Sequence, residues 1–156
     1  MTIKLQPQHQ QTIFTYAENT YPEECCGIIL GHLADNTKTV VEIWPTENAW
    51  NAQTAAELPE GKGIITKESR YAIAPRDMLK AQRAARDRTL SIIGIYHSHP
   101  NHPAIPSEMD RAIAWAVYSY IIVSVPQGKA ADLRSWCLDD THQFQPEEII
   151  ILPTEN

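Results

Sequence analysis

The stretch from Ile92 to Asp110, read as IIGIYHSHPNHPAIPSEMD, constrains this chain more than any other part of its sequence. Its apolar first half predicts a buried β-strand that runs into His97 and His99. Alternate side chains of a strand face the same way, so these two imidazoles share a face, roughly 7 Å apart along the chain. Pro100 has no N–H for a strand ladder and is expected to end the strand. The pattern therefore predicts two histidines that converge at a strand end.

The residues after Pro100 add a carboxylate to this pair. A loop returns the chain to an expected helix start at Ser107, and Asp110 lies three residues further on. Ser107-x-x-Asp110 also matches a capping box, which by itself explains both residues. The two interpretations are compatible, because an aspartate in a first helical turn stays ionised near the positive end of the helix dipole. Two histidines, a carboxylate and room for a water form the open, three-ligand zinc site of a hydrolase.

These residues resemble the pattern of the JAMM metallopeptidases, also called the MPN+ or JAB family: His-x-His-Pro, six residues, then Ser-x-x-Asp. The family also places a glutamate upstream in a Glu-x-Cys-Gly context, and Glu24-Cys25-Cys26-Gly27 fits this context. The resemblance covers the chain from about Phe14 to Trp136. It is strongest to small prokaryotic stand-alone members, some of which act on ubiquitin-like sulfur-carrier proteins.

The resemblance implies a role for each motif residue. His97, His99 and Asp110 would bind one Zn²⁺ per chain, although this ligand set alone would also accept iron. Glu24 would take a proton from the attacking water as general base and later deliver it to the leaving amine. Ser107 would stabilise the tetrahedral oxyanion through its hydroxyl or its N–H.

Three neighbouring residues offer alternatives to these roles. Only one of Glu23 and Glu24 can face the site from an incipient strand, and the family register selects Glu24. His102 could form a His-x-x-His pair with His99, but it matches no motif position and a loop histidine is more often solvated. Cys26 could offer a thiolate, yet a small residue in a packed strand is the simpler interpretation. Neither His102 nor Cys26 is therefore expected to bind the metal.

The composition narrows the class of protein further. Residues 1–156 are long enough for a proper core and are most simply one domain. No apolar run approaches the ~18 residues of a membrane span, and the polar N-terminus MTIKLQPQHQQ does not look like a signal peptide. The net charge of -6 gives no support to non-specific nucleic-acid binding. Three cysteines without a Cys-x-x-Cys spacing indicate a reducing, cytoplasmic location rather than a disulfide framework.

Hydrophobic periodicity predicts interleaved strands and helices. Helices are expected at 8–20, 75–88 and 109–117, and strands at 25–30, 39–44, 71–74, 90–96, 120–125, 131–137 and 144–152. The second helix is expected to turn Met78, Leu79, Gln82 and Ala85 to the core and a solvated basic face outward. Such an order places the fold in the α/β (α+β) class with a mixed sheet. The resemblance implies the MPN/JAB fold, a cytidine-deaminase-like curved mixed sheet flanked by helices.

From Pro45 to Ser69 the periodicity fails, although a short helix could lie within 48–58. A connection of this length is long for a compact domain and is often functional. It is either a flexible insertion or a flap beside the active site that helps to recognise substrate, as similar insertions do in the family.

Three functions remain open from the sequence. The motifs favour a zinc metallopeptidase or isopeptidase that cleaves after the C-terminal Gly-Gly of a ubiquitin-like or sulfur-carrier protein. Such a tail is extended and could add a strand to a sheet edge beside the zinc. A non-catalytic MPN-type scaffold is the second, but metal-free members of the family lack the histidines or the glutamate that this chain keeps. A zinc hydrolase of small amides is the third.

Overall fold

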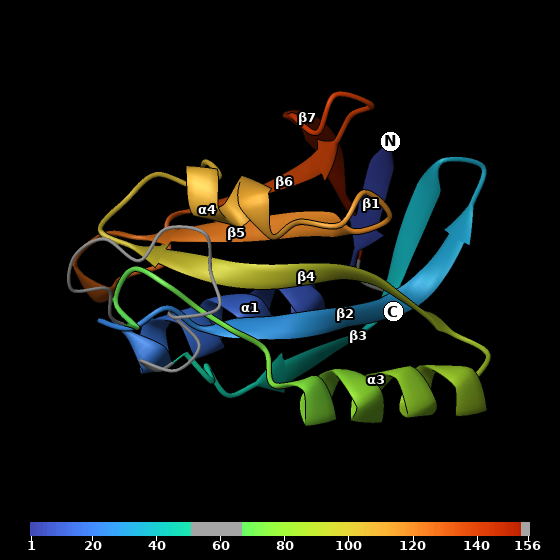
Figure 1. Cartoon of the computed structure of the whole chain (residues 1–156), viewed down its shortest axis with the longest axis horizontal. Coiled ribbons are helices and arrows are strands. Elements are labelled where there is room, and N and C mark those ends of the chain that lie inside the picture. Colours follow the sequence, from blue (N-terminus) through green and yellow to red (C-terminus); the bar gives the residue numbers. More distant parts are fainter. Residues whose placement is uncertain (51–66, 154–156) are drawn as a thin grey trace.

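The computed structural model describes residues 1–50 and 67–153 of the chain. Within these residues, seven strands form one mixed sheet (Figure 1). The strands are β1 (Thr2–Leu5), β2 (Cys26–Ala34), β3 (Thr37–Thr46), β4 (Ser91–Pro100), β5 (Ser119–Val125), β6 (Asp132–Leu138) and β7 (Phe144–Ile151). Their order, β1-β3-β2-β4-β5-β6-β7, closes into a barrel because β1 pairs with both β3 and β7. The three parallel pairs are β1–β3, β1–β7 and β4–β5, and the other pairs are antiparallel. The predicted α+β class with a mixed sheet is therefore confirmed.

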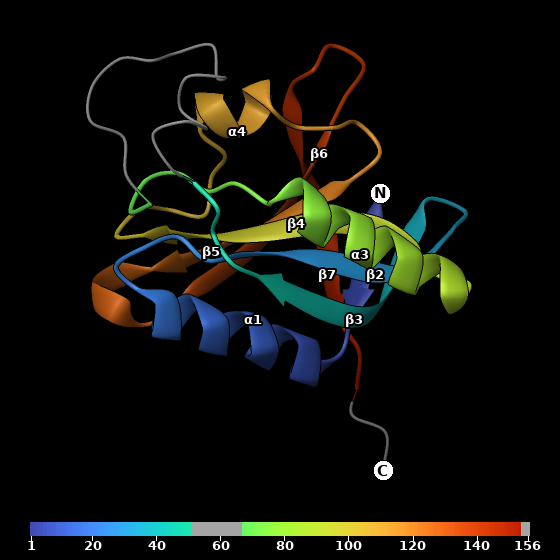
Figure 2. The same ribbon diagram turned by 60° about the horizontal axis from the view of Figure 1, so that its bottom comes forward.

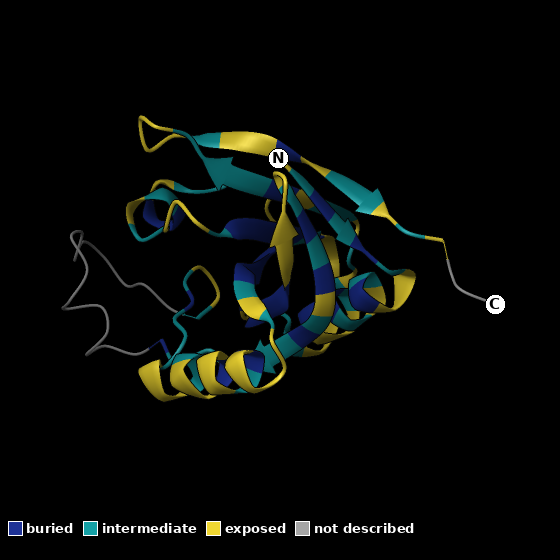
Figure 3. Ribbon diagram, turned by 90° about the vertical axis from the view of Figure 1, so that its right-hand side faces the viewer, coloured by how far each residue is buried: buried dark blue, intermediate teal, exposed yellow. Residues whose placement is uncertain are grey.

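Helices lie on both faces of this sheet. They are α1 (Pro7–Thr20), α3 (Pro75–Asp87) and α4 (Glu108–Ala112), with a 3-10 turn, η1, at Pro126–Gly128. α1 covers one face, and α3 and α4 lie on the other (Figure 2). β2 is consequently buried on both faces: Ile29 packs in the core beside α1, Ile28 and Leu30 pack in the core beside α3, and all three are 0% exposed. This double burial explains why β2 reads as a continuous apolar run. Figure 3, coloured by burial, shows the buried segments along strands in the interior of the molecule.

Most predicted elements occur where the sequence places them. α1 ends at Thr20, directly before Tyr21-Pro22, and its Ile13 and Ala17 are buried. The strand expected to carry both motif histidines and to end at Pro100 does so, since β4 spans Ser91–Pro100. His97 and His99 therefore belong to the central strand itself, as predicted.

The helix predicted at 109–117 is wrong beyond Ala112. Its apolar spacing fits a helix, but Trp115 and Val117 are each 68% exposed. The Trp115 N–H donates to the Tyr120 hydroxyl at 2.7 Å instead of to a helical carbonyl. The chain has to turn at this point to enter β5 beside β4, so the tertiary connection overrides the local pattern.

Two predictions near α3 are also wrong. Residues 71–74 do not form a strand, because the Ala72 N–H and carbonyl bond to the Asn48 side chain and the Ala49 N–H. Leu79 does not face the core, since it is 47% exposed and the buried residues of α3 are Ala81 and Ala85. The centre of the buried face lies at two alanines, of which the sequence analysis placed only Ala85 on the core side.

The sequence analysis missed the first strand altogether. β1 is only four residues long and alternates, with Ile3 and Leu5 fully buried and Lys4 between them partly exposed. Its edge contacts with β3 and β7 close the barrel. A segment this short carries too little periodicity to stand out within a polar N-terminus.

β2 and β4 lie close together where the two motifs meet. A Cβ atom on Gly27 would lie 2.3 Å from the ring of Tyr96, which is fully buried. Only a glycine allows this approach. The antiparallel register then pairs Cys26 with His97, and it thereby brings Glu24 next to the motif histidines.

Only the two ends of the long connection from Pro45 to Ser69 belong to the described residues. β3 extends to Thr46, and the described chain resumes at residue 67 after residue 50. The helix expected within 48–58, and most of the possible flap, lie outside the described residues. In the two described ranges, 1–50 and 67–153, no helix is long and apolar enough to cross a membrane.

Candidate metal centre and active site

β4 carries two histidines toward one point. The Nε2 atoms of His97 and His99 lie 3.1 Å apart, and each lies 3.2 to 3.3 Å from Oδ2 of Asp110. All three residues are buried. Among residues 1–50 and 67–153, these three form the group of histidine, cysteine and acidic side chains able to hold a metal ion. The structure thus brings together the three predicted ligands.

Ser98, between the histidines, points to the opposite side as the strand period requires. Its hydroxyl accepts the Cys25 N–H at 2.7 Å, and its own N–H donates to the Cys25 carbonyl at 3.1 Å. Cys25, the neighbour of Glu24, is therefore hydrogen-bonded to β4, the strand that carries His97 and His99. This side-chain bond links the two sequence motifs.

The surroundings of each imidazole orient its ring. His99 Nδ1 lies 2.8 Å from the Pro103 carbonyl, which can only accept, so Nδ1 carries the hydrogen and Nε2 keeps its lone pair. His97 stacks on Tyr71, with ring centroids 4.4 Å apart and planes 21° apart. Burial lowers the pKa of His97, which favours the neutral form that binds metals.

Asp110 and Ser107 form the predicted capping box and more. The Ser107 N–H donates to Asp110 Oδ2 at 2.9 Å, and the Asp110 N–H donates to the Ser107 hydroxyl at 3.0 Å. Burial alone would raise the pKa of Asp110, but its electrostatic interaction with His97 and the hydrogen bond from the Ser107 N–H outweigh burial and hold that pKa well below its usual range. The helix cap therefore also keeps the carboxylate ionised and fixes Oδ2 beside the histidines.

The donor set fits a zinc ion. The His99 Nε2 lone pair and Asp110 Oδ2 face one another at 3.2 Å, an arrangement that a shared cation stabilises. Two imidazole nitrogens and one carboxylate oxygen are ligands that zinc accepts, and three protein ligands leave a fourth position for water or substrate. All three of these ligand atoms, from His97, His99 and Asp110, belong to this chain.

Glu24 lies beside this group, whereas Glu23 does not. Glu24 is buried and lines the same pocket as His99 and Ser107, while Glu23 is exposed. Burial and the negative charge of Asp110 together raise the pKa of Glu24 to about 9, against the opposing positive charge of Arg70. A carboxyl with so perturbed a pKa in a cleft marks a candidate for proton transfer.

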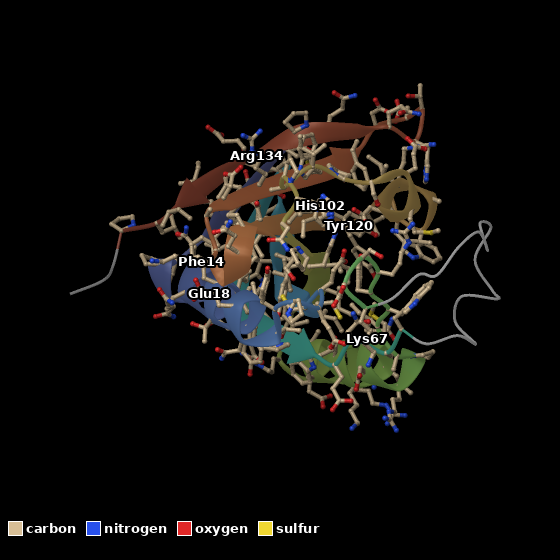
Figure 4. All side chains as sticks on the ribbon, turned by 90° about the vertical axis from the view of Figure 1, so that its left-hand side faces the viewer. Phe14, Glu18, Lys67, His102, Tyr120 and Arg134 are labelled. Atoms are coloured by element: carbon tan, nitrogen blue, oxygen red, sulfur yellow. The ribbon has the colours of Figure 1, made fainter. Side chains whose placement is uncertain are left out.

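The pocket over the site has a volume of about 290 Å³. Its lining includes Glu24, Arg70, His99, His102, Ile105 and Ser107. His102, labelled in Figure 4, is exposed on the loop after β4 and does not belong to the metal-binding group. The walls therefore come from the loop after β4 and from residues that follow the long connection.

Cys26 does not approach the metal group. Its Sγ lies 3.5 Å from the Thr46 hydroxyl and 3.6 Å from the Glu47 carbonyl. Burial raises the pKa of the Cys26 thiol to about 12, which disfavours the thiolate that a ligand or nucleophile requires. The packing role expected for this residue agrees with its contacts.

Three residues at the site were not found from the sequence. Tyr71 stacks on His97, Arg70 influences the charge of Glu24, and Asn48 bonds to the backbone of both Glu24 and Arg70. Each lies in or beside the connection where periodicity fails. Isolated residues of these types match no local pattern, so only the fold brings them together.

Comparison with known proteins identifies the family. Residues 6–139 match the family described as prokaryotic homologs of the JAB domain. The chain belongs to this family. A relative from Haloferax volcanii named Desampylase is 30% identical over 124 residues, which cover 79% of this chain and 76% of that protein.

A second relative and a solved structure extend the comparison. The probable TtuB-protein conjugate cleaving protease of Thermus thermophilus is 43% identical over 53 residues, 33% of this chain and 35% of the relative. The solution structure of a protein from Desulfitobacterium hafniense matches with a TM-score of 0.78 and 24% identity, covering 97% of this chain and 94% of that one. The latter likeness supports the fold of this JAB-domain protein.

Proposed function

We propose that this JAB-domain protein is a zinc-dependent isopeptidase that cleaves after the C-terminal glycine of a ubiquitin-like or sulfur-carrier protein. The observation that carries the proposal is the convergence of buried His97, His99 and Asp110 beside Glu24 in one pocket. The names of the two relatives, Desampylase and TtuB-protein conjugate cleaving protease, point to protein conjugates as the substrate class.

His97, His99 and Asp110 would hold one Zn²⁺ per chain. When bound, the ion would supply Lewis-acid activation of a water molecule and of the substrate carbonyl. His99 presents Nε2 because its Nδ1–H is held by the Pro103 carbonyl. Asp110 presents Oδ2 because the Ser107 N–H fixes that oxygen. Two of the three ligands are thus preorganised by bonds to the backbone, and His97 is oriented by its stacking on Tyr71.

Glu24 is proposed as the group that moves the proton. For this step Glu24 starts as the carboxylate, the form that the positive charge of Arg70 favours, and its burial and proximity to Asp110 favour the protonated form that it reaches once it has taken a proton from water. It can then donate that proton to the leaving amine, which departs as a neutral group. Glu23, exposed to solvent, has no such position.

Ser107 is proposed to stabilise the oxyanion through its hydroxyl. Its N–H is already donated to Asp110, and its oxygen accepts the Asp110 N–H. Among the bonds of the described residues, its hydroxyl hydrogen is given to no acceptor, so it can turn toward the pocket that Ser107 lines. Loss of one such donor costs about 10²- to 10³-fold in kcat in comparable sites.

Broader features of the proposal follow from the fold and the family. Residues 1–156 are proposed to act as one domain, because strands near both ends pair in one sheet. The finer likeness to the cytidine-deaminase sheet stays a prediction. A reducing compartment such as the cytoplasm suits the three cysteines, Cys25, Cys26 and Cys137, which are free. The extended Gly-Gly tail would enter the pocket over Glu24.

The first test compares Glu24→Gln with Glu23→Gln. The substrate is a conjugate in which a ubiquitin-like protein is joined to a lysine through its C-terminal glycine. Glu24→Gln is expected to keep fold and zinc and to lose hydrolysis by about 10²-fold or more, as expected for a general base. Glu23→Gln is expected to change little. If Glu23→Gln lost hydrolysis and Glu24→Gln kept it, the general base would be Glu23 instead.

The second test is metal content. Purified wild-type protein should bind one zinc per chain, and His99→Ala and Asp110→Ala should each lose it. Elemental analysis after dialysis measures the stoichiometry, and thermal unfolding confirms that the variants fold. Full zinc content in both variants would refute the ligand assignment.

A further inference from the structure

We infer that Asn48 is a positioning residue that holds Glu24 in place for proton transfer. The inference deepens the proposed function and rests on it. Asn48 lies after β3, at the start of the long connection, and is not itself a lining residue of the pocket, but its side chain bonds to the backbone of two residues that are, Glu24 and Arg70. Its effect on the reaction would therefore pass through Glu24.

All four hydrogen-bonding positions of the Asn48 amide are used. Nδ2 donates to the Glu24 carbonyl at 3.0 Å and to the Arg70 carbonyl at 2.9 Å. Oδ1 accepts the N–H of Trp50 at 3.0 Å and the N–H of Ala72 at 3.1 Å. Asparagine has two donor hydrogens and two acceptor lone pairs, so the side chain is saturated. Such a side chain has one orientation that satisfies every partner.

The bonds join three separate segments at Glu24. Glu24 precedes β2 and has no strand partner of its own, but its N–H donates to the Lys67 carbonyl at 2.6 Å and its carbonyl accepts from Asn48. The Ala49 N–H adds a bond to the Ala72 carbonyl at 2.8 Å. Both ends of the long connection are thereby fastened to one another and to the backbone of Glu24.

The same amide also bonds to the residues on either side of Tyr71. Arg70 and Ala72, which bond to Asn48, flank Tyr71, the residue that stacks on His97. Arg70 opposes the rise in the pKa of Glu24. Small displacements of a catalytic group cost much in rate, since a misplacement of about 1 Å can cost 10²-fold. Asn48 is the side chain best placed to prevent such a displacement.

Asn48→Asp is the sharpest substitution. Aspartate has the same shape and keeps both acceptors, but it loses both donors and sets a carboxylate oxygen against the carbonyls of Glu24 and Arg70. We expect kcat to fall by about 10- to 100-fold, with KM changed less than about twofold and one zinc retained per chain. Asn48→Ser, which is smaller and uncharged, replaces it if Asn48→Asp does not fold.

A matched control separates positioning from loss of stability. Asp139, on the turn between β6 and β7, is also a hydrogen-bonding centre: its side chain accepts from Thr141, Gln143 and Gln145. Asp139→Ala should lower the unfolding temperature while leaving kcat unchanged. A double-mutant cycle adds the second control, since Asn48→Asp should cost no further activity in the Glu24→Gln background. Single-turnover rates at saturating enzyme provide the measurement.

The outcomes are distinct. A lowered kcat with retained zinc, and no added loss in the Glu24→Gln background, supports the inference. Wild-type kcat in Asn48→Asp, or an equal further loss in both backgrounds, overturns it while leaving the proposed function intact. Full activity of Glu24→Gln contradicts the proposed role of Glu24, and the inference falls with it.

Discussion

One buried hydrogen bond links the two sequence motifs, and Ser98→Ala tests its contribution. The Ser98 hydroxyl accepts the Cys25 N–H at 2.7 Å, and the two residues are 0% and 5% exposed. Alanine removes this acceptor and little else, because the backbone bond from the Ser98 N–H to the Cys25 carbonyl stays. The variant is therefore expected to leave the Cys25 N–H buried without a partner.

The magnitude follows from this unpaired donor. A buried donor that loses its acceptor costs about 1–3 kcal/mol of the free energy of unfolding. For a chain of 156 residues, each kcal/mol lowers the melting temperature by about 2–4 °C, so the expected loss is roughly 2 to 12 °C. Zinc content should not change, because Ser98 points away from the side of β4 that carries His97 and His99.

Urea unfolding at fixed zinc concentration, followed by circular dichroism, measures the loss. Ser124→Ala is the matched control: its hydroxyl donates to the His102 carbonyl at an exposed position. An exposed substitution of this kind usually changes stability by less than about 0.5 kcal/mol. If the two variants unfold within that margin of one another, the bond from Cys25 to Ser98 does not hold the motifs together.

Three further predictions concern the packing and pH response. Gly27→Ala should cost about 1–3 kcal/mol or more in urea unfolding, because its Cβ would lie 2.3 Å from the Tyr96 ring. Tyr96→Phe should be neutral or stabilising, since in the described structure the Tyr96 hydroxyl is buried without a partner; a loss above about 1 kcal/mol would contradict this. Burial lowers the pKa of His9, against the opposing Val41 carbonyl, so the folded protein takes up this proton less readily than the unfolded chain. Stability should therefore fall as pH drops through about 6.5, and His9→Gln should gain on the wild type between pH 7.5 and 5 in the same assay.

The metal group could be predicted from the sequence because it is local. His97, His99 and Asp110 lie within one strand, one loop and one short helix, and strand period and capping box fix their directions. Glu24 was selected over Glu23 through the family register, and of the two residues Glu24 is the buried one. Such features depend on neighbours in sequence, which a pattern can represent.

What could not be predicted depends on contacts between distant segments. The helix predicted at 109–117 ends at Ala112 because the chain turns there to enter β5, and the Trp115 N–H bonds to the Tyr120 hydroxyl instead of to a helical carbonyl. Nothing in the local sequence distinguishes Asn48 from other loop asparagines, because its partners come from residues 67–72, which lie beside it only in the folded chain. His9 likewise lies in a polar stretch, yet it is buried and accepts the Gln6 N–H. None of these roles has a local signature.

The site combines two halves that are held by different means. The proposed metal ligands lie on β4 and α4, and bonds to backbone groups of Pro103 and Ser107 fix two of them, His99 and Asp110. Glu24 instead stands before β2, and its backbone is held by both ends of the long connection. Metal binding and proton transfer should therefore be separable by substitution. The two ends of the long connection also hold the backbone of Glu24. A substrate contact that displaces these ends should therefore change the rate of the proposed hydrolysis at a displacement that leaves zinc affinity unchanged.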